Sequence, residues 1–270
     1  MRQPLSFATW MLAQLSHAMK GLVYLAILII VLSIGLHVTL PESRFVPGPS
    51  EFGASFQAMF LRGAILTHVM VSCFRVLGGF TLAFCIALCL AISVLSVRSL
   101  RGTLIPVNSF LRYVPPTAFT ILLIGVFGVG EGYKIAAVFF GIVFFLLSML
   151  VDAFDSVDRR YVEMGLVEGH SRIEIAFRII LPSTLPKIID VARINLSAAW
   201  TFLVVAELVG AQEGLGYLVH ISQRFGRVAD VFLLVLVFGV IGWLFDAILY
   251  GLSRLVVPWH YALALSGRNL

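Results

Sequence analysis

The sequence YKIAAVFFGIVFFLLSMLVDA, residues 133–153, decides the fold class. A helix needs about 20 mostly apolar residues to cross a bilayer, and this stretch supplies them. Its charged side chains, Lys134 and Asp152, lie next to its two ends. The apolar residues do not alternate with polar ones, as they would in a strand of a membrane β-barrel. The stretch therefore predicts a membrane-spanning α-helix.

Five further stretches follow the same pattern, and the six together predict an all-α membrane protein with about six transmembrane helices. Of the 270 residues, 60% are hydrophobic and only 12% are charged, and the mean hydropathy is +1.02. Soluble domains carry about 25% charged residues, so this composition excludes a water-soluble monomer. The other five stretches are 21–38, 68–97, 104–127, 188–211 and 231–257.

The positions of the basic residues predict how the chain is oriented in the membrane. The net charge of +5 comes from Lys and Arg at the ends of apolar stretches, which indicates membrane orientation and not nucleic-acid binding. If both termini are cytoplasmic, more of the Lys and Arg residues lie on the cytoplasmic side of the membrane than on the outer side. The expected layout is a cytoplasmic amphipathic lead at 1–20, a first transmembrane helix at 21–38, an extracytoplasmic loop at 39–67, a transmembrane core at 68–257 with a cytoplasmic loop at 154–187, and a cytoplasmic tail at 258–270.

The loop at 154–187 is the longest polar stretch on the cytoplasmic side, and it predicts a capped pair of helices. A short helix over 160–168 is expected to stop at Gly169, a residue suited to a left-handed turn. A second helix is expected to begin at the capping box Ser171-Arg172-Ile173-Glu174 and to end at Pro182.

This pair of helices has two interpretations. It is either a self-contained hairpin or a docking surface for a partner. We favour docking, because Met164, Leu166 and the bare backbone of Gly165 would otherwise present apolar surface to water.

No motif for catalysis or metal binding is recognisable. None of the three lysines follows a glycine, which rules out a phosphate-binding loop of the Walker type. The six histidines are scattered without ligand spacing. We therefore expect no catalytic residue, no metal and no cofactor on this chain. If the protein uses ATP, another chain must supply the ATP site. The cysteines, Cys73, Cys85 and Cys89, are interpreted as small buried apolar residues.

The loop resembles the signature of permease subunits of bacterial ATP-binding-cassette (ABC) importers. That signature reads EAA, three residues, Gly, a spacer and then I-x-L-P. Here Glu163-Met164-Gly165 stands in place of EAA, so that Met164 and Gly165 depart from the two alanines, and Gly169 takes the glycine position. Ile179-Ile180-Leu181-Pro182 closes the motif. By this resemblance, the residues that couple to the ATPase are Glu163, Met164, Gly165, Leu166, Gly169, Leu181 and Pro182.

Other stretches narrow the resemblance to the alkanesulfonate, taurine and nitrate/bicarbonate type of permease. They are FVPGP at 45–49, SCFRVLGGF at 72–80, RYVPP at 112–116 and AELVGAQEGLGY at 206–217. The resemblance covers about residues 45–260, and it identifies the family much more sharply than the solute.

The resemblance implies a type I ABC importer fold in the bacterial inner membrane. Its partners would be a second copy of the chain, two ABC ATPase subunits, an extracytoplasmic solute-binding protein and membrane lipid, with no nucleic acid. ATP-driven closure of the ATPases would move the loop and rock the helices. The chain would form the path of a small, anionic solute of the sulfonate, taurine, nitrate or bicarbonate class.

Three alternatives are left open by the sequence. A permease of this architecture can carry another solute, such as a heterocyclic vitamin precursor. A secondary transporter would use Glu207 or Asp246 as a proton site and would show inverted repeats, which are not seen. An intramembrane enzyme would need a nucleophile and base, and none can be nominated.

Polar residues within the apolar stretches are the candidates for the solute pathway. Glu207 either lines the pathway or anchors the structure, and we favour the anchor because a carboxylate is unsuited to an anion site. Arg75 either meets an anion or pairs with Glu207. Pro115 and Pro116 either kink a helix at the pathway or start a span. The remaining candidates are Asn195 and Trp200, and packing in the core is the favoured interpretation for Trp200.

Overall fold

The computed structural model describes residues 47–61 and 64–259, which are helical throughout apart from turns, with no strand among them. The predicted helix at 21–38 and the lead at 1–20 lie outside these residues. The described chain falls into two compact units. Unit 1 comprises residues 47–70 and 213–251, and unit 2 comprises residues 71–212 and 252–259.

Unit 1 contains three short helical segments, α2, η1 and α10, together with the beginning of α3 and most of α11. A π-helical turn, η1, directly follows α2, and a T-shaped contact at 6.0 Å joins Phe52 of α2 to Phe232 of α11. Nδ1 of His68 on α3 accepts a hydrogen bond of 2.9 Å from the backbone N–H of Gly214, just before α10. The bounds are Pro49–Phe56 for α2, Gln57–Leu61 for η1, Ala64–Ser96 for α3, Leu215–Arg224 for α10 and Val228–Val256 for α11.

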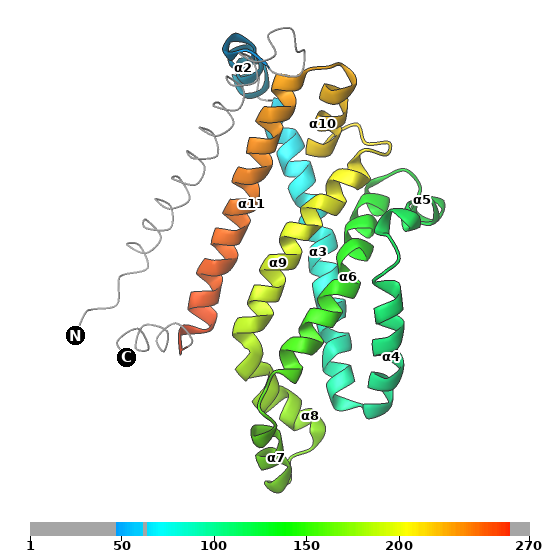
Figure 1. The fold of residues 1–270 in the computed structure, drawn as a ribbon, viewed down its shortest axis with the longest axis vertical. Helices are drawn as coiled ribbons and strands as arrows, with labels where there is room; N and C mark the ends of the chain where they lie inside the picture. The colour runs from blue at the N-terminus through cyan, green and yellow to red at the C-terminus, as the bar shows by residue number, and fades with distance from the viewer. Residues whose placement is uncertain (1–46, 62–63, 260–270) are drawn as a thin grey trace, which may run out of the picture. The chain divides into compact units, whose positions relative to one another are not determined.

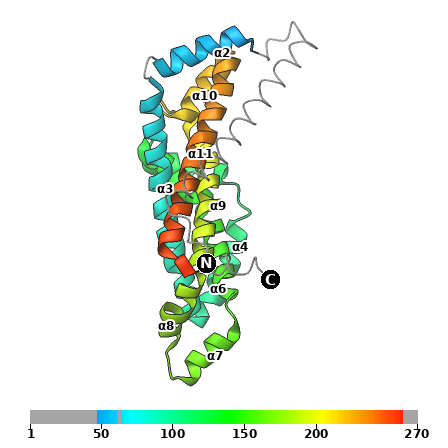
Figure 2. The ribbon, with the colours of Figure 1, turned by 90° about the vertical axis from the view of Figure 1, so that its left-hand side faces the viewer.

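Unit 2 is built around the antiparallel helices α6 and α9, with α3 and α4 beside α6 (Figure 1). Two short helices, α7 and α8, lie beyond the ends of α6 and α9 (Figure 2). The bounds are Arg98–Leu111 for α4, Pro116–Phe119 for the 3₁₀ turn η2, Thr120–Phe127 for α5, Glu131–Asp155 for α6, Arg159–Val167 for α7, Arg172–Ile175 for α8, Ala176–Ile180 for the π-helical turn η3 and Leu181–Glu207 for α9.

Glycines allow the helices of unit 2 to pack closely. A Cβ added to Gly79 of α3 would lie 2.8 Å from the backbone oxygen of Ile135 and 2.6 Å from Cβ of Val138, both on α6. A Cβ on Gly141 of α6 would lie 2.5 Å from Cγ of Phe202 on α9. In a membrane, such close approaches stabilise helix pairs through van der Waals packing.

Replacing Gly79 with alanine is expected to destabilise the protein by about 1–3 kcal/mol, because the obstacle is helix backbone that has no rotamer to change. The thermal unfolding midpoint of the purified protein in detergent measures this loss. Gly102→Ala is the control, since a Cβ there meets nothing within 4 Å. Equal midpoints for the two variants would contradict the close α3–α6 packing.

The number of spans agrees with the sequence as far as the described residues go. Four helices are long and apolar enough to cross a membrane, and a bent pair supplies a fifth. The four lie at Ile65–Ser96, Glu131–Asp155, Arg172–Glu207 and Val228–Val256.

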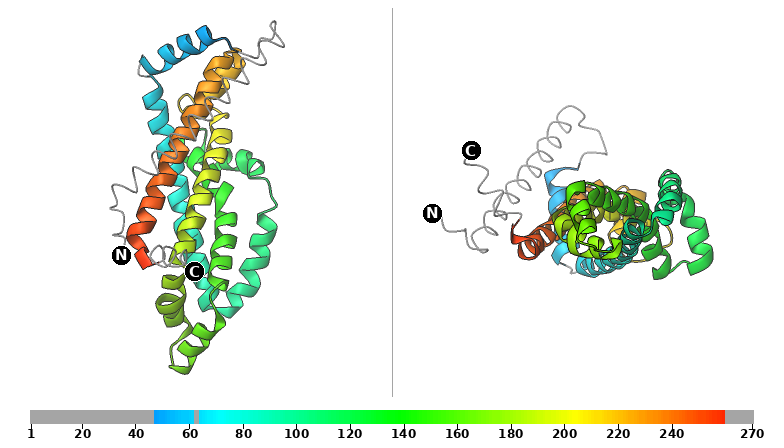
Figure 3. Two further views of the ribbon diagram at one scale, coloured as in Figure 1. Left: turned by 60° about the vertical axis from the view of Figure 1, so that its left-hand side comes forward. Right: turned by 90° about the horizontal axis from the view of Figure 1, so that it is seen from below.

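The stretch at 104–127 was predicted as one span that Pro115 and Pro116 kink or begin, and the structure shows a sharp break there. The stretch is broken between Leu111 and Pro116, and the helical segments on either side meet at 91° (Figure 3, left). The cause is the pair Pro115 and Pro116, which removes two adjacent backbone donors and fixes both φ angles.

The prediction that Pro182 ends a helix is also wrong. Helical structure continues from Arg172 to Glu207, and Pro182 lies in the first turn of α9. The π-helical turn η3 directly precedes that turn. Proline is tolerated in the first turn of a helix, where its missing N–H is not needed, and the change from π- to α-helix creates such a position.

The interpretation of the cysteines is wrong for two of the three. Cys85 and Cys89 are exposed along one face of α3, and Cys73 is half-buried. They share this face with the exposed apolar residues Leu82 and Ile86, so the sulfur atoms face the surroundings of the chain and not its core.

Candidate functional site

Helix α7 is capped at both ends. At its start, the carboxylate of Asp158 accepts a hydrogen bond of 3.0 Å from the backbone N–H of Arg160. At its end, Gly169 adopts φ +84°, and the backbone N–H groups of Gly169 and His170 donate to the carbonyls of Leu166 and Gly165, both at 3.0 Å. This is a Schellman motif, which satisfies the terminal carbonyls of the helix. The predicted stop at Gly169 is confirmed.

Helix α8 begins at the predicted capping box. The backbone N–H of Glu174 donates to Oγ of Ser171 at 3.3 Å, and the carboxylate of Glu174 accepts from the backbone N–H of Ser171 at 2.9 Å. From this cap the helical structure runs through α8, η3 and α9 for 36 residues. The hairpin, defined as residues 156–182, is therefore continuous with a membrane span.

Gly165 lies inside the hairpin and not on its surface. It is buried, and a Cβ in its place would lie 2.8 Å from Cδ1 of Ile179 and 3.1 Å from Cγ1 of Ile175. The expectation that its bare backbone contributes to an exposed docking surface is wrong. Its role is to let α7 approach the second helix of the hairpin closely.

The rest of the hairpin exposes a large apolar area, which we call the hairpin surface. Met164 is 58% exposed and Val167 is 88% exposed, and Glu163 lies exposed beside them. Of the other predicted coupling residues, Leu181 is half-buried and Pro182 is exposed. The hairpin surface consists of Tyr161, Met164, Leu166, Val167, Ile173 and Phe177.

A charge cluster joins three helices at the opposite end of unit 2. The guanidinium of Arg75 on α3 donates two hydrogen bonds of 2.6 Å to the carboxylate of Glu131 on α6 and one of 2.7 Å to Glu207 on α9. Oγ of Ser72 donates to the same oxygen of Glu207 at 2.8 Å, and Nζ of Lys134 donates to Glu131 at 3.0 Å. The cluster, defined as Arg75, Glu131, Lys134 and Glu207, has no net formal charge.

Of the two predicted roles of Arg75, binding an anion or pairing with Glu207, the structure shows the pairing with Glu207. Both side chains are almost completely buried, with exposed fractions of 2% and 0%. Glu131 and Lys134 were not predicted to belong to this cluster. The sequence did contain a signal for their ion pair, since Glu131 directly follows a glycine-rich turn and Lys134 lies one helical turn further on.

The remaining candidate pathway residues lie in different places. Pro115 and Pro116 form the break between α4 and α5. Asn195 and Trp200 are buried on α9. Nδ2 of Asn195 donates to the carbonyl of Val191 at 2.9 Å and to the sulfur of Met149 at 3.2 Å, so it joins α9 to α6.

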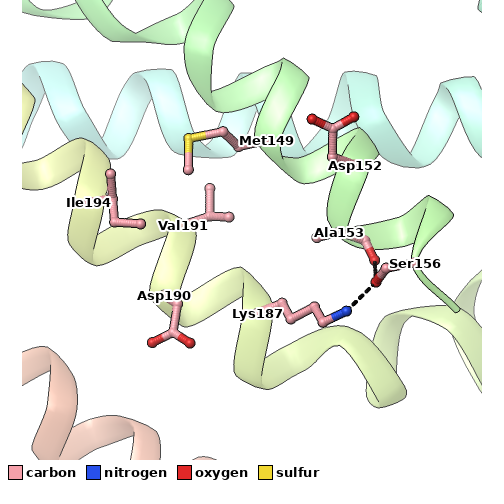
Figure 4. A pocket seen from close by; sticks show the side chains of 8 residues that line it. All are labelled: Met149, Asp152, Ala153, Ser156, Lys187, Asp190, Val191 and Ile194. Atoms are coloured by element: carbon pink, nitrogen blue, oxygen red, sulfur yellow. Dashed lines mark hydrogen bonds between the residues drawn. The ribbon is translucent and has the colours of Figure 1, made fainter.

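A cavity of about 360 Å³ lies between α6 and α9 near the hairpin, and the sequence analysis missed it. Asp152 of α6 and Asp190 of α9 are among its lining residues, and their carboxylates point away from each other (Figure 4). Nζ of Lys187 donates to Oγ of Ser156 at 2.5 Å at its end. Within residues 47–61 and 64–259, no group of His, Cys, Asp and Glu side chains could hold a metal ion.

Together, the apolar helices, the buried charges and the exposed hairpin define a membrane-embedded transport subunit. Residues 79–259 match the family described as "Binding-protein-dependent transport system inner membrane component", and the chain belongs to this family of ABC importer permeases.

Named relatives agree with this assignment. A protein of Bacillus subtilis (strain 168), described as an aliphatic sulfonates transport permease protein SsuC, is 31% identical over 247 residues, which cover 90% of this chain and 88% of the relative. The taurine transport system permease protein TauC of Escherichia coli (strain K12) is 29% identical over 201 residues, which cover 74% of this chain and 73% of the relative. The resemblance to permeases of the sulfonate and taurine type is confirmed.

A solved structure has the same fold. An inward-facing structure of the MetNI methionine ABC transporter aligns with a TM-score of 0.63 at 17% identity, and the match covers 74% of this chain and 97% of that one. The chain therefore has the predicted type I ABC importer permease fold.

Proposed function

We propose that this chain forms the membrane path of an ATP-driven importer for a small anionic solute, and that the hairpin surface couples it to a separate ATPase. The observation that carries the coupling is the exposed apolar surface of the hairpin. Helix α6 has 25 residues and is about 37 Å long, whereas the hydrocarbon core is about 30 Å thick. Asp155 at the end of α6 therefore lies at a membrane boundary, and the hairpin lies beyond it in water.

The hairpin has the properties that a docking element needs. Its two helices are capped, so their positions are fixed before a partner binds. When a partner covers apolar side chains that face water, such as Met164 and Val167, the free energy falls and the complex is stabilised. Neighbouring charges, such as Glu163 and Arg160, would form a polar rim around the contact.

The solute class rests on the relatives. Those with a named solute include permeases for aliphatic sulfonates and taurine, all of which carry an anionic group. We propose a sulfonate or a related oxyanion, such as nitrate or bicarbonate, as the solute of this chain.

The proposed assembly follows the family pattern. Two copies of the chain would enclose the path in the bacterial inner membrane, two ATPases would bind ATP and Mg below them, and a solute-binding protein would dock on the outside. Both termini would be cytoplasmic, which places the hairpin on the cytoplasmic side. The proposed layout keeps 1–20 as the lead, 39–67 as an outer segment and 258–270 as the tail.

Met164→Glu is expected to weaken ATPase binding about tenfold, because it places a charge in the centre of an apolar contact. The tagged chain is purified from membranes of its native host in mild detergent, and ATP hydrolysis in the eluate is measured per mole of chain. Arg178→Gln is the matched control on the same hairpin, since its ion pair with Glu174 is long (3.8 Å) and exposed. An eluate of the unchanged chain without ATPase activity would refute the coupling proposal.

A further inference from the structure

Arg112 lies at the break between α4 and η2. It is the C-cap residue of α4, and its guanidinium carbon lies 5.9 Å from the ring centroid of Tyr113, which is 81% exposed. Arg112 itself is only partly buried. Pro115 and Pro116 have no backbone N–H to continue the helix, so irregular backbone follows this side chain.

The contacts of α4 with α6 fix the depth of Arg112 in the membrane. Arg101 of α4 forms a bidentate ion pair with Asp155, at the hairpin end of α6. Arg112 follows about three helical turns later, which is about 16 Å. Asn108, one turn before it, donates hydrogen bonds to the carbonyl of Phe144 at 3.1 Å and to Oγ of Ser148 at 2.8 Å, near the middle of α6. Arg112 therefore lies near the centre of the hydrocarbon layer.

Arg112 differs from Arg75 in its partners. Arg75 binds two carboxylates, whereas no carboxylate of the described residues lies within 4.0 Å of the Arg112 guanidinium. A charged side chain that faces lipid at this depth is strongly unfavourable, so intramembrane arginines face a protein interior or a water-filled path. An arginine without a carboxylate partner in such a path is able to bind an anion.

Arg112 lies on the same face of α4 as Arg101 and Asn108, and that face packs against α6. The opposite, exposed face carries Ser99, Thr103, Pro106 and the apolar Phe110. The Arg112 side chain is therefore turned towards α6 and not towards the exposed face of α4.

We propose that Arg112 is the cation that binds the anionic group of the solute, at a site formed by the break between α4 and η2. Tyr113 packs against the guanidinium and limits its orientations. The guanidinium presents several N–H donors in one plane, which suits the oxygens of a sulfonate or another oxyanion. This proposal rests on the proposed function, since it names the solute contact of that same path. Arg75 has a different role, because its charge is already neutralised.

The first test measures uptake by the complete assembly with its ATPase and binding protein in proteoliposomes. Radiolabelled taurine is the probe. Arg112→Gln is expected to raise the taurine concentration for half-maximal uptake, or to lower uptake at a fixed concentration, by about tenfold or more, since a hydrogen bond to a charged group is lost. Arg112→Lys keeps the charge but not the planar set of donors, so its uptake should lie between that of Arg112→Gln and that of the unchanged protein. Arg193→Gln is the control, because Arg193 is another arginine on a span and pairs with Asp190 at 3.3 Å.

A second test needs no transported probe and no active variant. Arg112→Cys is combined with replacement of Cys73, Cys85 and Cys89 by serine, and inverted membrane vesicles are treated with a charged, water-soluble thiol reagent. Labelling at Arg112→Cys is expected, and labelling at Leu82→Cys on the apolar face of α3 is not.

The outcomes separate the two proposals. Absence of labelling at Arg112→Cys, or equal taurine uptake by Arg112→Gln and the unchanged protein, overturns the anion site. In either case ATP hydrolysis by the co-purified ATPase leaves the importer function standing. Absence of an ATPase from the purified assembly refutes that function, whatever the labelling at Arg112→Cys shows.

Discussion

Replacing Arg75 with alanine is expected to destabilise the permease by about 3–5 kcal/mol. The change leaves the carboxylate of Glu207 buried without the cation that neutralises it, and an unpaired buried charge is among the most costly defects in a protein. The thermal unfolding midpoint of the purified chain in detergent measures the loss. A fall of about 6–20 °C corresponds to this range for a protein of this size.

Two further variants test whether charge causes this loss. Arg101→Ala removes an arginine that pairs with Asp155 at a site where both side chains are over 40% exposed. That variant should lose less than about 1 kcal/mol. The double variant Arg75→Met with Glu207→Met removes both buried charges and should recover most of the stability of Arg75→Ala. A double variant no more stable than Arg75→Ala would show that packing, and not charge, accounts for the effect.

Gly165→Val is expected to reduce solute uptake below about a tenth of that of the unchanged protein. The branched side chain needs more space than the Ile175 and Ile179 side chains leave, so α7 must move away from the second helix of the hairpin. The hairpin surface then loses its shape, and a loss of about 1.4 kcal/mol in ATPase binding already lowers occupancy tenfold when the partner is scarce. Uptake into proteoliposomes and co-purification of the ATPase measure the two effects.

Gly165→Ala is the matched control for this variant. Its single Cβ meets the flexible end of Ile179, which can turn away, so uptake should stay within about twofold of the original value. Unfolding midpoints should change little for either variant, because the hairpin lies outside the membrane core. Normal uptake by Gly165→Val would show that the position of α7 does not matter for coupling.

The apolar stretches of the sequence predicted the spans well, because hydrocarbon imposes a minimum length on any helix that crosses it. The stretches at 133–153 and 231–257 correspond closely to α6 and α11. The proline pair Pro115 and Pro116 indicated an interruption in the stretch at 104–127, but neither hydropathy nor the prolines gave the 91° between its two halves. The effect of Pro182 was also misjudged, because a π-helical turn cannot be recognised from a capping box and a proline.

Features of the candidate sites that depend on neighbouring residues in the sequence were predictable, and features that depend on packing between helices were not. The capping box at Ser171 and the stop at Gly169 depend on neighbours in the sequence, and both were predicted. The burial of Gly165 depends on Ile179, and the pairing of Arg75 with Glu131 and Glu207 joins three helices. No spacing in the sequence determines such contacts, because they arise only when the helices pack.

The helical structure from Arg172 to Glu207 connects the hairpin directly to the charge cluster, because Glu207 is the partner of Arg75. It spans 36 residues, which is about 54 Å. A fluorescent dye attached near Leu208 would therefore report events that occur at the far end of the same rod. Its emission should change when nucleotide is added to the intact complex, with no solute present.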